Sequence, residues 1–367
     1  KTVLQSAAMQ IDTALRWSWS NVLTTKRYLA LKEKFGDLDT ALAQWSQEFL
    51  EALGVREDAT LVALNRMDEF DPENYSAELK KRSLKFITCE DPDYPERLKE
   101  LPDFPVFLYM KGDLDALKEP LISVVGAREM SDYGRRAAGH FVPAFVKAGM
   151  VTVSGLAFGV DAEVARETLS SGGRTVAVLG HGLGMIYPKA NERLAKEILD
   201  KGGLILSEFP LDTSPDKYTF PARNRIIAGL GLGTLVIEAA DGSGSLITAD
   251  LALDYGRDVF AVCGSIFDPN YAGCHQIISR GLAKLVSSPE EVLTELGVVA
   301  GATEKKEFNA GSPEEDVIYK ALTSLPSPLD DLVVKTKLEA AMINATLTIL
   351  ELKGAAKNVG AGKWVRN

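Results

Sequence analysis

Short apolar runs that end near glycine and alternate with helix-forming stretches recur from residue 84 to residue 264. No other feature constrains the fold as strongly. The runs are LKFITC, PVFLYM, LISVVG, MVTVSG, RTVAVLG, GLILSE, TLVIEA and DVFAVCG. Short glycine-bounded runs separated by helices are typical of βαβ units, whose parallel strands are covered on both faces. The sequence therefore predicts an α/β fold with an extended Rossmann-like parallel sheet.

The segments on either side of this region lack the alternation. Residues 1–80 contain short amphipathic helices and no strand-like runs, which indicates an N-terminal helical domain that acts as a spacer, a protein contact or a DNA contact. Residues 298–313 lose apolar periodicity and are expected to form a linker. Residues 314–367 contain three helical stretches and a Gly-Ala-Gly turn, which predict a C-terminal winged helix. The Rossmann-like domain is then expected to span residues 81–297.

The composition excludes several classes of protein. The chain has 367 residues, 46% of them hydrophobic, which is enough for two or three domains with a core. No apolar stretch is long enough for a membrane span and the start lacks the order of a signal peptide, so we expect a cytoplasmic protein without a membrane partner. The three cysteines and three histidines show no metal-ligand spacing, so neither a disulfide framework, a metal nor another cofactor is expected.

The net charge of −10 argues against a nucleic-acid partner until its distribution is considered. Residues 121–230 carry 13 basic and 11 acidic groups, whereas residues 231–300 carry 3 basic and 9 acidic groups. Residues 1–120 are also acidic, and residues 301–367 are balanced. The region 121–230 is therefore the one in which binding of an anion is expected.

Glycine-rich loops follow several of the predicted strands. In an open parallel sheet, ligands bind beyond the carboxyl ends of the strands, where loops and helix N-termini present free N–H groups. Glycine lets a bulky anion approach the backbone, and serine or threonine at a helix start offers further donors. The candidate residues are Gly126, Arg128 and the loops 154–161, 180–184 and 241–249, the last of which contains Ser243, Gly244, Ser245 and Thr248.

Two common nucleotide motifs are absent from these loops. The first turn reads GAREMSDYG rather than G-x-G-x-x-G, and no G-x-x-x-x-G-K-[ST] is present, which argues against NAD and against a P-loop nucleotidase. The stretch GLGLGTLVIEA loosely resembles the glycine-rich motif of nucleotide-monophosphate phosphoribohydrolases, with Glu238 or Glu208 as the acid. That enzyme class is the alternative function.

The stretch FPARNRIIAGL sets Arg223, Asn224 and Arg225 at the start of a predicted helix. Residues two apart on a helix point about 200° apart, so the two arginines cannot serve one face. Arg223 shares its side with Ile226, Ile227 and Leu230 and is expected to point inward and pair with Glu208 or Glu238. Arg225 is then the expected phosphate ligand.

Several motifs occur together and in order. They are VVGAREMSDYG, VSGLAFGVDAEVA, RTVAVLGHGLGMIYPKAN, LILSEFP, FPARNRIIAGL, SGSLITA, GRDVFAVCGSI and GCHQII. In this combination the chain closely resembles the DprA/Smf family, the DNA-processing protein A family, most densely over residues 85–297. The N-terminal helices resemble that family's SAM-like domain, and the C-terminus resembles its winged helix.

The resemblance implies a protein that is not an enzyme. It implies binding and protection of incoming single-stranded DNA during natural transformation, loading of the RecA recombinase, and a homodimer formed through the Rossmann-like domain. By matching motifs, the resemblance places in the DNA-binding face Gly126, Arg128, Arg174, Arg223, Asn224, Arg225, Ser243, Gly244 and Ser245.

The chain departs from the family pattern at three positions. Ala165 stands where the family usually has histidine, Gly184 where it usually has aspartate, and Cys263 where it usually has proline. Without the histidine, no base obviously serves a hydrolytic reaction, and the chain reads as a divergent member of the family.

The remaining expectations concern the dimer and the C-terminus. GCHQIISRGLAKLV places apolar residues where a sheet edge needs cover, and His275, Ile278 and Leu285 are the expected dimer contacts, although ordinary helix-on-sheet packing explains some of them equally well. The third helix of the winged helix, LEAAMINATLTILEL, contains no lysine or arginine, so recognition of duplex DNA is not expected.

Overall fold

The computed structural model describes residues 9–298, 310–322, 327–358, 360 and 362–366. The chain divides into two compact units, Lys1–Gly301 and Ala302–Asn367, which are described separately. The expected linker 298–313 lies mostly outside the described residues. Among the described residues, no helix combines the length and the apolar character needed to cross a membrane.

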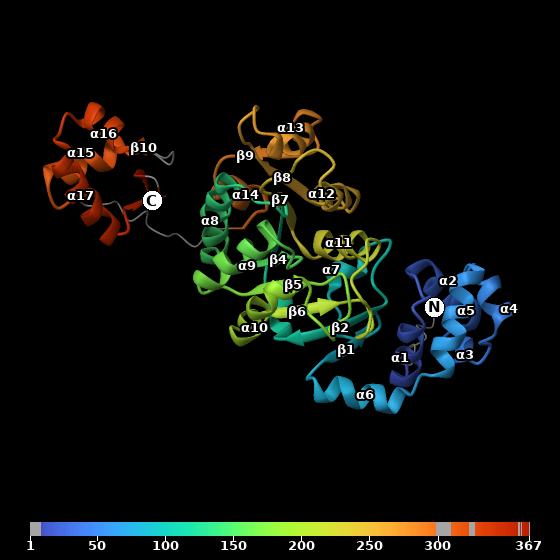
Figure 1. Ribbon diagram of the computed structural model, residues 1–367. Helices are drawn as coiled ribbons and strands as arrows, with labels where there is room; N and C mark the ends of the chain where they lie inside the picture. The colour runs from blue at the N-terminus through green and yellow to red at the C-terminus, as the bar shows by residue number, and fades with distance from the viewer. Residues whose placement is uncertain (1–8, 299–309, 323–326, 359, 361, 367) are drawn as a thin grey trace. The chain divides into compact units, whose positions relative to one another are not determined.

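The first unit is built on a nine-stranded sheet with the order β1-β2-β6-β5-β4-β3-β7-β8-β9 (Figure 1). The strands from β6 to β9 in this order are parallel, and β2 joins β6 in antiparallel register, with Tyr109 opposite Ser207. An α/β fold with a mostly parallel sheet is thereby confirmed. The strands are β1 Lys85–Thr88, β2 Phe107–Gly112, β3 Leu121–Val125, β4 Val151–Ser154, β5 Thr175–Val178, β6 Leu204–Ser207, β7 Gly233–Val236, β8 Asp258–Val262 and β9 Lys284–Val286.

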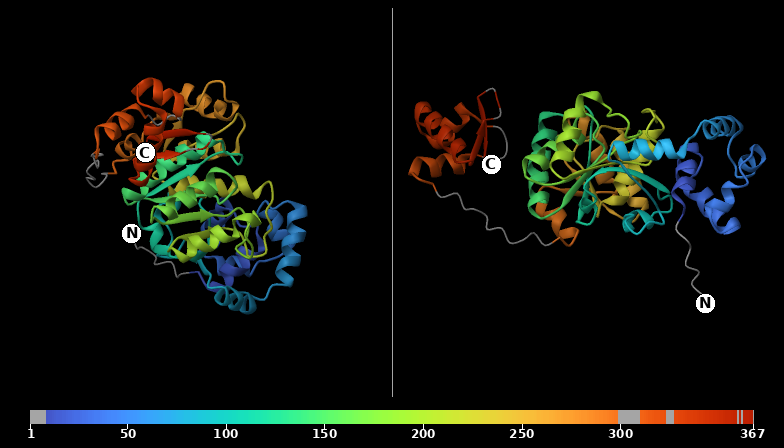
Figure 2. Two further views of the ribbon diagram at one scale, coloured as in Figure 1. Left: turned by 60° about the vertical axis from the view of Figure 1, so that its left-hand side comes forward. Right: turned by 90° about the horizontal axis from the view of Figure 1, so that it is seen from below.

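Helices cover both faces of this sheet, which explains why β3 to β7 are buried at every position (Figure 2). One face is covered by α8 Asp132–Lys147, α9 Val160–Ser170, α10 Glu192–Asp200 and α14 Pro289–Glu295. The other is covered by α7 Glu96–Lys99, α11 Thr219–Leu230, α12 Gly244–Asp254 and α13 Ala272–Ser279. Short 3₁₀ turns connect these elements: η1 Leu114–Leu117, η2 Lys189–Asn191 and η3 Pro269–Tyr271.

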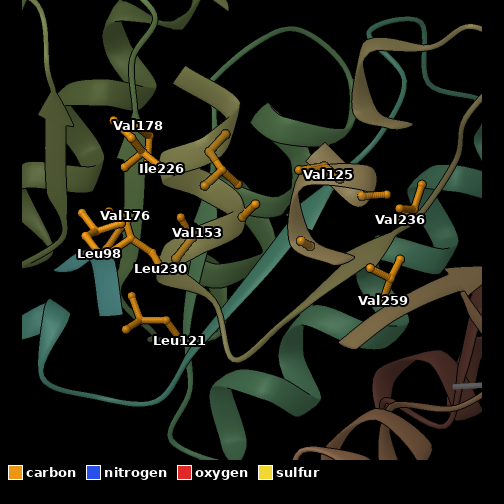
Figure 3. Packing of buried hydrophobic residues seen from close by; sticks show 14 of the residues in the cluster. Leu98, Leu121, Val125, Val153, Val176, Val178, Ile226, Leu230, Val236 and Val259 are labelled. Carbon is orange, nitrogen blue, oxygen red and sulfur yellow. The ribbon is translucent and has the colours of Figure 1, made fainter. Parts of the chain in front are cut away.

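The core beneath α11 holds the FPARNRIIAGL segment in place. Ile226 and Leu230 belong to the same buried cluster as Val176 and Val178 of β5, and Figure 3 shows these side chains gathered between helix and sheet. Because Ile226 and Leu230 are four residues apart, they lie on one face of the helix. Their burial fixes which residues of α11 point toward the sheet.

The N-terminal helices pack against the antiparallel edge of the sheet. Ser18 and Tyr109 share a hydrogen bond of 2.8 Å between their hydroxyl oxygens, and Glu90 accepts bonds of 2.8 Å from Tyr28 and from Lys32. Side chains of Thr24, Asp37, Ser46 and Asp71 cap four of these helices. The helices are α1 Ile11–Ser20, α2 Thr25–Phe35, α3 Leu38–Leu42, α4 Gln47–Ala52, α5 Glu57–Asp68 and α6 Pro72–Lys81.

The second unit combines helices with a small antiparallel sheet of order β10-β12-β11. Ile318, Leu332, Ile343 and Trp364 form its core. This is the winged-helix architecture predicted for the C-terminus. Its elements are α15 Pro313–Ala321, β10 Ser327–Pro328, α16 Leu329–Thr336, α17 Ala340–Leu352, β11 Ala356–Asn358 and β12 Lys363–Arg366.

Candidate functional site

The loops after β3 and β4 pack tightly against each other at the carboxyl edge of the sheet. A Cβ atom at Gly126 would lie 2.6 Å from Val160 Cγ2, so a larger residue does not fit there. Gly159 has a φ of +71°, and a Cβ on it would collide with the Ala127 carbonyl. The Val160 amide in turn donates to that carbonyl at 3.0 Å. These glycines are required because one loop packs on the other.

A pocket lies at this edge, between the loops after β3, β4 and β5 and the start of α11. Arg128 is exposed, and its guanidinium carbon lies 5.3 Å from the centroid of the Phe220 ring. No ion pair links Arg128 to any described carboxylate, so its charge is available to a ligand. The lining residues are Arg128, Gly155, Ala157, Phe158, Gly180, His181, Tyr187, Pro188 and Phe220.

The pocket walls combine that cation with exposed aromatic surface. Phe158 and Tyr187 are each 49% exposed, and the rings of Tyr187 and Phe220 lie 6.1 Å apart. Nucleobases stack on such rings, and the neighbouring arginine can bind a phosphate. The arrangement suits a ligand that is both flat and anionic.

Arg223 is buried beneath the pocket, with 5% of its surface exposed. Its Nη1 donates to the Gly155 carbonyl at 2.9 Å and also to the Val178 carbonyl, while Nε donates to Asn224 Oδ1 at 3.1 Å. Burial lowers the pKa of Arg223 to about 10, and nearby Asp161 opposes that shift. The inward direction of Arg223 is confirmed, but its expected pairing with Glu208 or Glu238 is wrong.

Asp161 completes this buried arrangement. Its Oδ2 accepts from the Gly155 amide at 3.1 Å and from the Ala157 amide at 3.3 Å. Burial raises the pKa of Asp161, while the charge of Arg223 and these hydrogen bonds lower it. Asn191 holds the same loop from the other side by donating to the Leu156 carbonyl at 2.9 Å. Arg223, Asp161 and Asn191 therefore position the floor of the pocket.

Arg225 forms the ion pair that was expected of Arg223. Its Nη2 binds Glu208, and Nε lies 3.9 Å from Asp103 Oδ2. Only 15% of the Arg225 side chain and 16% of the Glu208 side chain are exposed. Asn224 links α11 to α12, because its Nδ2 donates to the Gly244 carbonyl at 3.4 Å. A carboxylate thus already neutralises Arg225, and the geometry does not favour it as a phosphate ligand.

The serine residues at the start of α12 are divided between surface and interior. Ser243 caps the helix by accepting from the Ser245 amide, and the two hydroxyl oxygens lie 2.8 Å apart. Gly244 is exposed and has open space around its Cβ position. Ser245 is 8% exposed and Thr248 is 2% exposed. Thr248 lies too deep to reach a ligand at the surface, whereas Ser243 and Gly244 are accessible.

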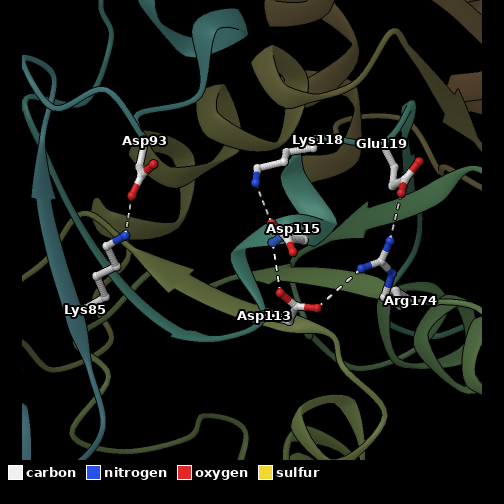
Figure 4. Close-up of polar contacts among 7 residues, drawn as sticks. All are labelled: Lys85, Asp93, Asp113, Asp115, Lys118, Glu119 and Arg174. Carbon is white, nitrogen blue, oxygen red and sulfur yellow. Dashed lines mark hydrogen bonds and ion pairs between the residues drawn. The ribbon is translucent and has the colours of Figure 1, made fainter.

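Arg174 lies at the opposite edge of the sheet. It precedes β5, so it is at the amino ends of the strands, and it forms ion pairs of 3.4 Å with Asp113 and 3.1 Å with Glu119 (Figure 4). The structure therefore does not bring Arg174 together with Arg128. The prediction placed Arg174 at the same edge as Arg128. Arg174 precedes its strand, whereas the pocket is formed at the carboxyl ends of the strands.

Glu238 lies two residues after the end of β7 and is 0% exposed. Ser131 donates to it from its amide at 3.1 Å and also from its hydroxyl, and the Tyr271 hydroxyl lies 3.1 Å from it. Its carboxylate therefore anchors the start of α8 and the η3 turn. A buried carboxylate with its oxygens occupied cannot protonate a leaving group in the pocket.

The family-pattern departures occupy structural positions. Ala165 is 3% exposed and packs in the core between α9 and β5. The Gly184 amide donates to the Leu211 carbonyl at 3.1 Å. Cys263 is exposed after β8, and its carbonyl accepts from Tyr133 at 2.8 Å.

The expected dimer residues lie near the β9 edge of the sheet. His275 Nε2 is 3.1 Å from the Gly264 carbonyl, and Ile278 packs partly against the core. Leu285 is 44% exposed on β9, the last strand of the sheet. Of these three residues, Leu285 offers the most free apolar surface.

Sequence reasoning missed the aromatic components of the pocket and two nearby cations, Lys189 and Lys217. Phe158, Tyr187 and Phe220 stand inside quoted motifs, and Lys217 is exposed three residues before Phe220. Phe158 and Tyr187 each follow a glycine of a strand-ending loop, which was a usable signal because large aromatic residues are highly buried on average and a loop residue of this kind indicates a surface role.

Comparison with known proteins assigns the chain to a family. The family model described as DNA recombination-mediator protein A matches residues 85–297, and the DprA winged helix domain matches residues 303–362. The chain belongs to the DNA recombination-mediator protein A family. The fold and the role of the family, DNA processing by a recombination mediator, agree with the resemblance seen in the motifs.

Curated relatives match over most of their length. The chain is 38% identical to Protein Smf of Escherichia coli (strain K12) over 276 residues, which are 74% of this chain and 74% of that protein. It is 41% identical to DNA processing protein DprA of Streptococcus pneumoniae over 74% of this chain and 94% of the relative.

Solved structures of the family are also similar. The X-ray structure of DNA processing protein A from Streptococcus pneumoniae has a TM-score of 0.66 at 38% identity and covers 78% of this chain and 98% of that one. A structure of the Helicobacter pylori protein, which concerns its unique single-stranded DNA binding mode, has a TM-score of 0.52 at 29% identity, with 58% and 95% covered.

Proposed function

We propose that this chain binds single-stranded DNA at the carboxyl edge of its sheet, through the pocket that contains Arg128 and Phe220. The observation that carries the proposal is an exposed arginine without a described carboxylate partner, 5.3 Å from an aromatic ring. A phosphate at Arg128 and a base against the neighbouring rings would occupy the two kinds of surface together.

The surroundings of the pocket support a strand rather than a single nucleotide. Lys189 directly follows the lining residue Pro188, and Lys217 is three residues before the lining residue Phe220; both lysines are exposed, and neither forms an ion pair with a described residue. Ser243 and Gly244 extend the accessible edge beyond β7. Contacts to phosphates and ring faces tolerate any base, so the proposed binding depends little on sequence.

The family membership supports a wider role. We propose that the bound strand is protected and passed to the RecA recombinase, as the DprA/Smf resemblance implies, and that natural transformation is the setting. A homodimer through His275, Ile278 and Leu285 and a cytoplasmic location belong to the same proposal. Residues 1–80 and 314–367 would serve as accessory domains to a DNA-binding domain spanning 81–297.

We propose a binding role rather than catalysis. Neither candidate acid is free, because Glu238 accepts bonds from Ser131 and Tyr271 while Glu208 forms an ion pair with Arg225. Burial raises the pKa of Glu208, and Arg225 opposes that shift. Neither carboxylate lines the pocket, and a general acid must lie within hydrogen-bond reach of the group that it protonates.

The proposal is tested by comparing two arginines on opposite edges of the sheet. Arg128→Ala should weaken binding of a fluorescent dT20 strand by about tenfold, as expected for loss of one charge-assisted contact. Arg174→Ala serves as the matched control, because Arg174 lies at the amino edge with Asp113 and Glu119. Equal affinity of the two folded variants in fluorescence anisotropy would contradict the proposed site.

A further inference from the structure

His181 lies in the wall of the pocket and is 1% exposed. Its Nδ1 is 2.9 Å from the Gly182 carbonyl, and its Nε2 is 3.3 Å from the Tyr187 amide nitrogen. A carbonyl can only accept and an amide N–H can only donate. These two partners therefore require a neutral ring with its hydrogen on Nδ1.

The bond to Tyr187 holds the outer wall of the pocket. Gly182 and Gly184 are fixed by backbone bonds to Thr213 and Leu211. For residues 185–187, the bond to His181 is the one backbone hydrogen bond found among the described residues. Ile186 packs partly against the core, but Tyr187 is 49% exposed and forms part of the pocket lining. The position of the Tyr187 backbone thus depends on His181.

The charged groups around the His181 ring disfavour its protonated form. Arg223 on α11 acts on His181 electrostatically, and Arg128 lines the same pocket from the loop after β3. Asp161 faces Arg223 and the Gly155 loop. A proton on Nε2 would set an N–H against the Tyr187 N–H, beside two existing positive charges. The wall would then lose its hydrogen bond and move.

We propose that His181 is a pH-sensitive positioning residue, whose neutral ring holds Tyr187 against the single-strand pocket and whose protonation releases that wall. The inference rests on the proposed function. Burial lowers the pKa of His181 from its ordinary 6.5. Because the folded pKa is below the unfolded one, the contribution of the neutral ring is complete above pH 6.5 and is lost as the pH falls through the lowered value.

The test compares the full-length protein with His181→Gln, measured from pH 7.5 to pH 5 at constant ionic strength. A glutamine can accept from Tyr187 and donate to Gly182 without titrating. Binding of dT20 by the parent should weaken roughly threefold to tenfold in acid, as loss of one hydrogen bond allows, while His181→Gln should stay nearly constant. His140→Gln, on the exposed face of α8, is the control and should follow the parent.

The outcomes separate this inference from the proposed function. A parent that fails to bind dT20 at pH 7.5 would overturn both. Normal binding at pH 7.5 with the same acid profile in the parent and in His181→Gln would overturn the role of His181 alone. His181→Ala is expected to bind weakly at every pH, and the comparison with His181→Gln stands even if the alanine variant does not fold.

Discussion

Replacing Arg223 by methionine should destabilise the first unit severely without removing an exposed charge. The guanidinium satisfies the carbonyls of Gly155 and Val178 and the side chain of Asn224, and it lies beside buried Asp161. Removal of a buried charged donor typically costs about 3–5 kcal/mol, because the acceptors that it satisfied and the nearby Asp161 carboxylate stay buried. We expect a loss of that size in the free energy of unfolding.

The measurement is urea unfolding followed by circular dichroism at 222 nm, with Lys217→Met as the matched control. Lys217 is an exposed cation just before the same helix, so its replacement should change the unfolding free energy by less than about 0.5 kcal/mol. In the double variant with Asp161→Asn the loss should be smaller, since the buried carboxylate is removed as well. An Arg223→Met protein within about 1 kcal/mol of the parent would refute the structural role of this arginine.

Three further predictions concern the C-terminal residues, the exposed edge strand β9 and the buried carboxylate Glu238. Removal of residues 312–367 should leave the affinity for dT20 within about tenfold of the full-length value in fluorescence anisotropy, because α17 has no basic residue. A larger loss would show that the C-terminal residues contribute to binding. Leu285→Arg should shift the protein toward monomer in sedimentation, since that side chain is exposed on β9, and an unchanged dimer would exclude this contact. Glu238→Gln should lower the unfolding free energy by about 1–3 kcal/mol, because its bonds to Ser131 and Tyr271 are buried. In base-release assays neither it nor the parent should act on nucleoside monophosphates; release by the parent would favour the enzyme alternative.

The periodicity of the sequence predicted eight of the nine strands of the sheet. Each of the eight apolar runs corresponds to one of the strands β1 to β8, because strands covered on both faces are rich in apolar residues. The short edge strand β9, Lys284–Val286, was missed, since two of its three residues are exposed and leave no apolar run. The antiparallel pairing of β1 and β2 also could not be read from runs alone.

The candidate site was predicted in part. Arg128 and the glycine loops follow from the rule that ligands bind at the carboxyl ends of parallel strands. The helical period correctly separated Arg223 from Arg225, but it could not identify their partners. Those depend on which loops meet at the sheet edge: Gly155 and Val178 reach Arg223, and Glu208 reaches Arg225. Sequence spacing contains no information on such long-range contacts.

The central claim, that a strand binds along the carboxyl edge through Arg128 and its neighbours, is tested most directly by affinity as a function of strand length and salt. With Arg128, Lys217 and Lys189 free at this edge, log affinity should fall with log salt with a slope of about −2 per protomer, at roughly 0.7 per phosphate neutralised. Affinity should rise from dT4 to dT20, and Arg128→Ala should reduce the slope by about 0.7. Binding that is independent of both length and salt would contradict the account.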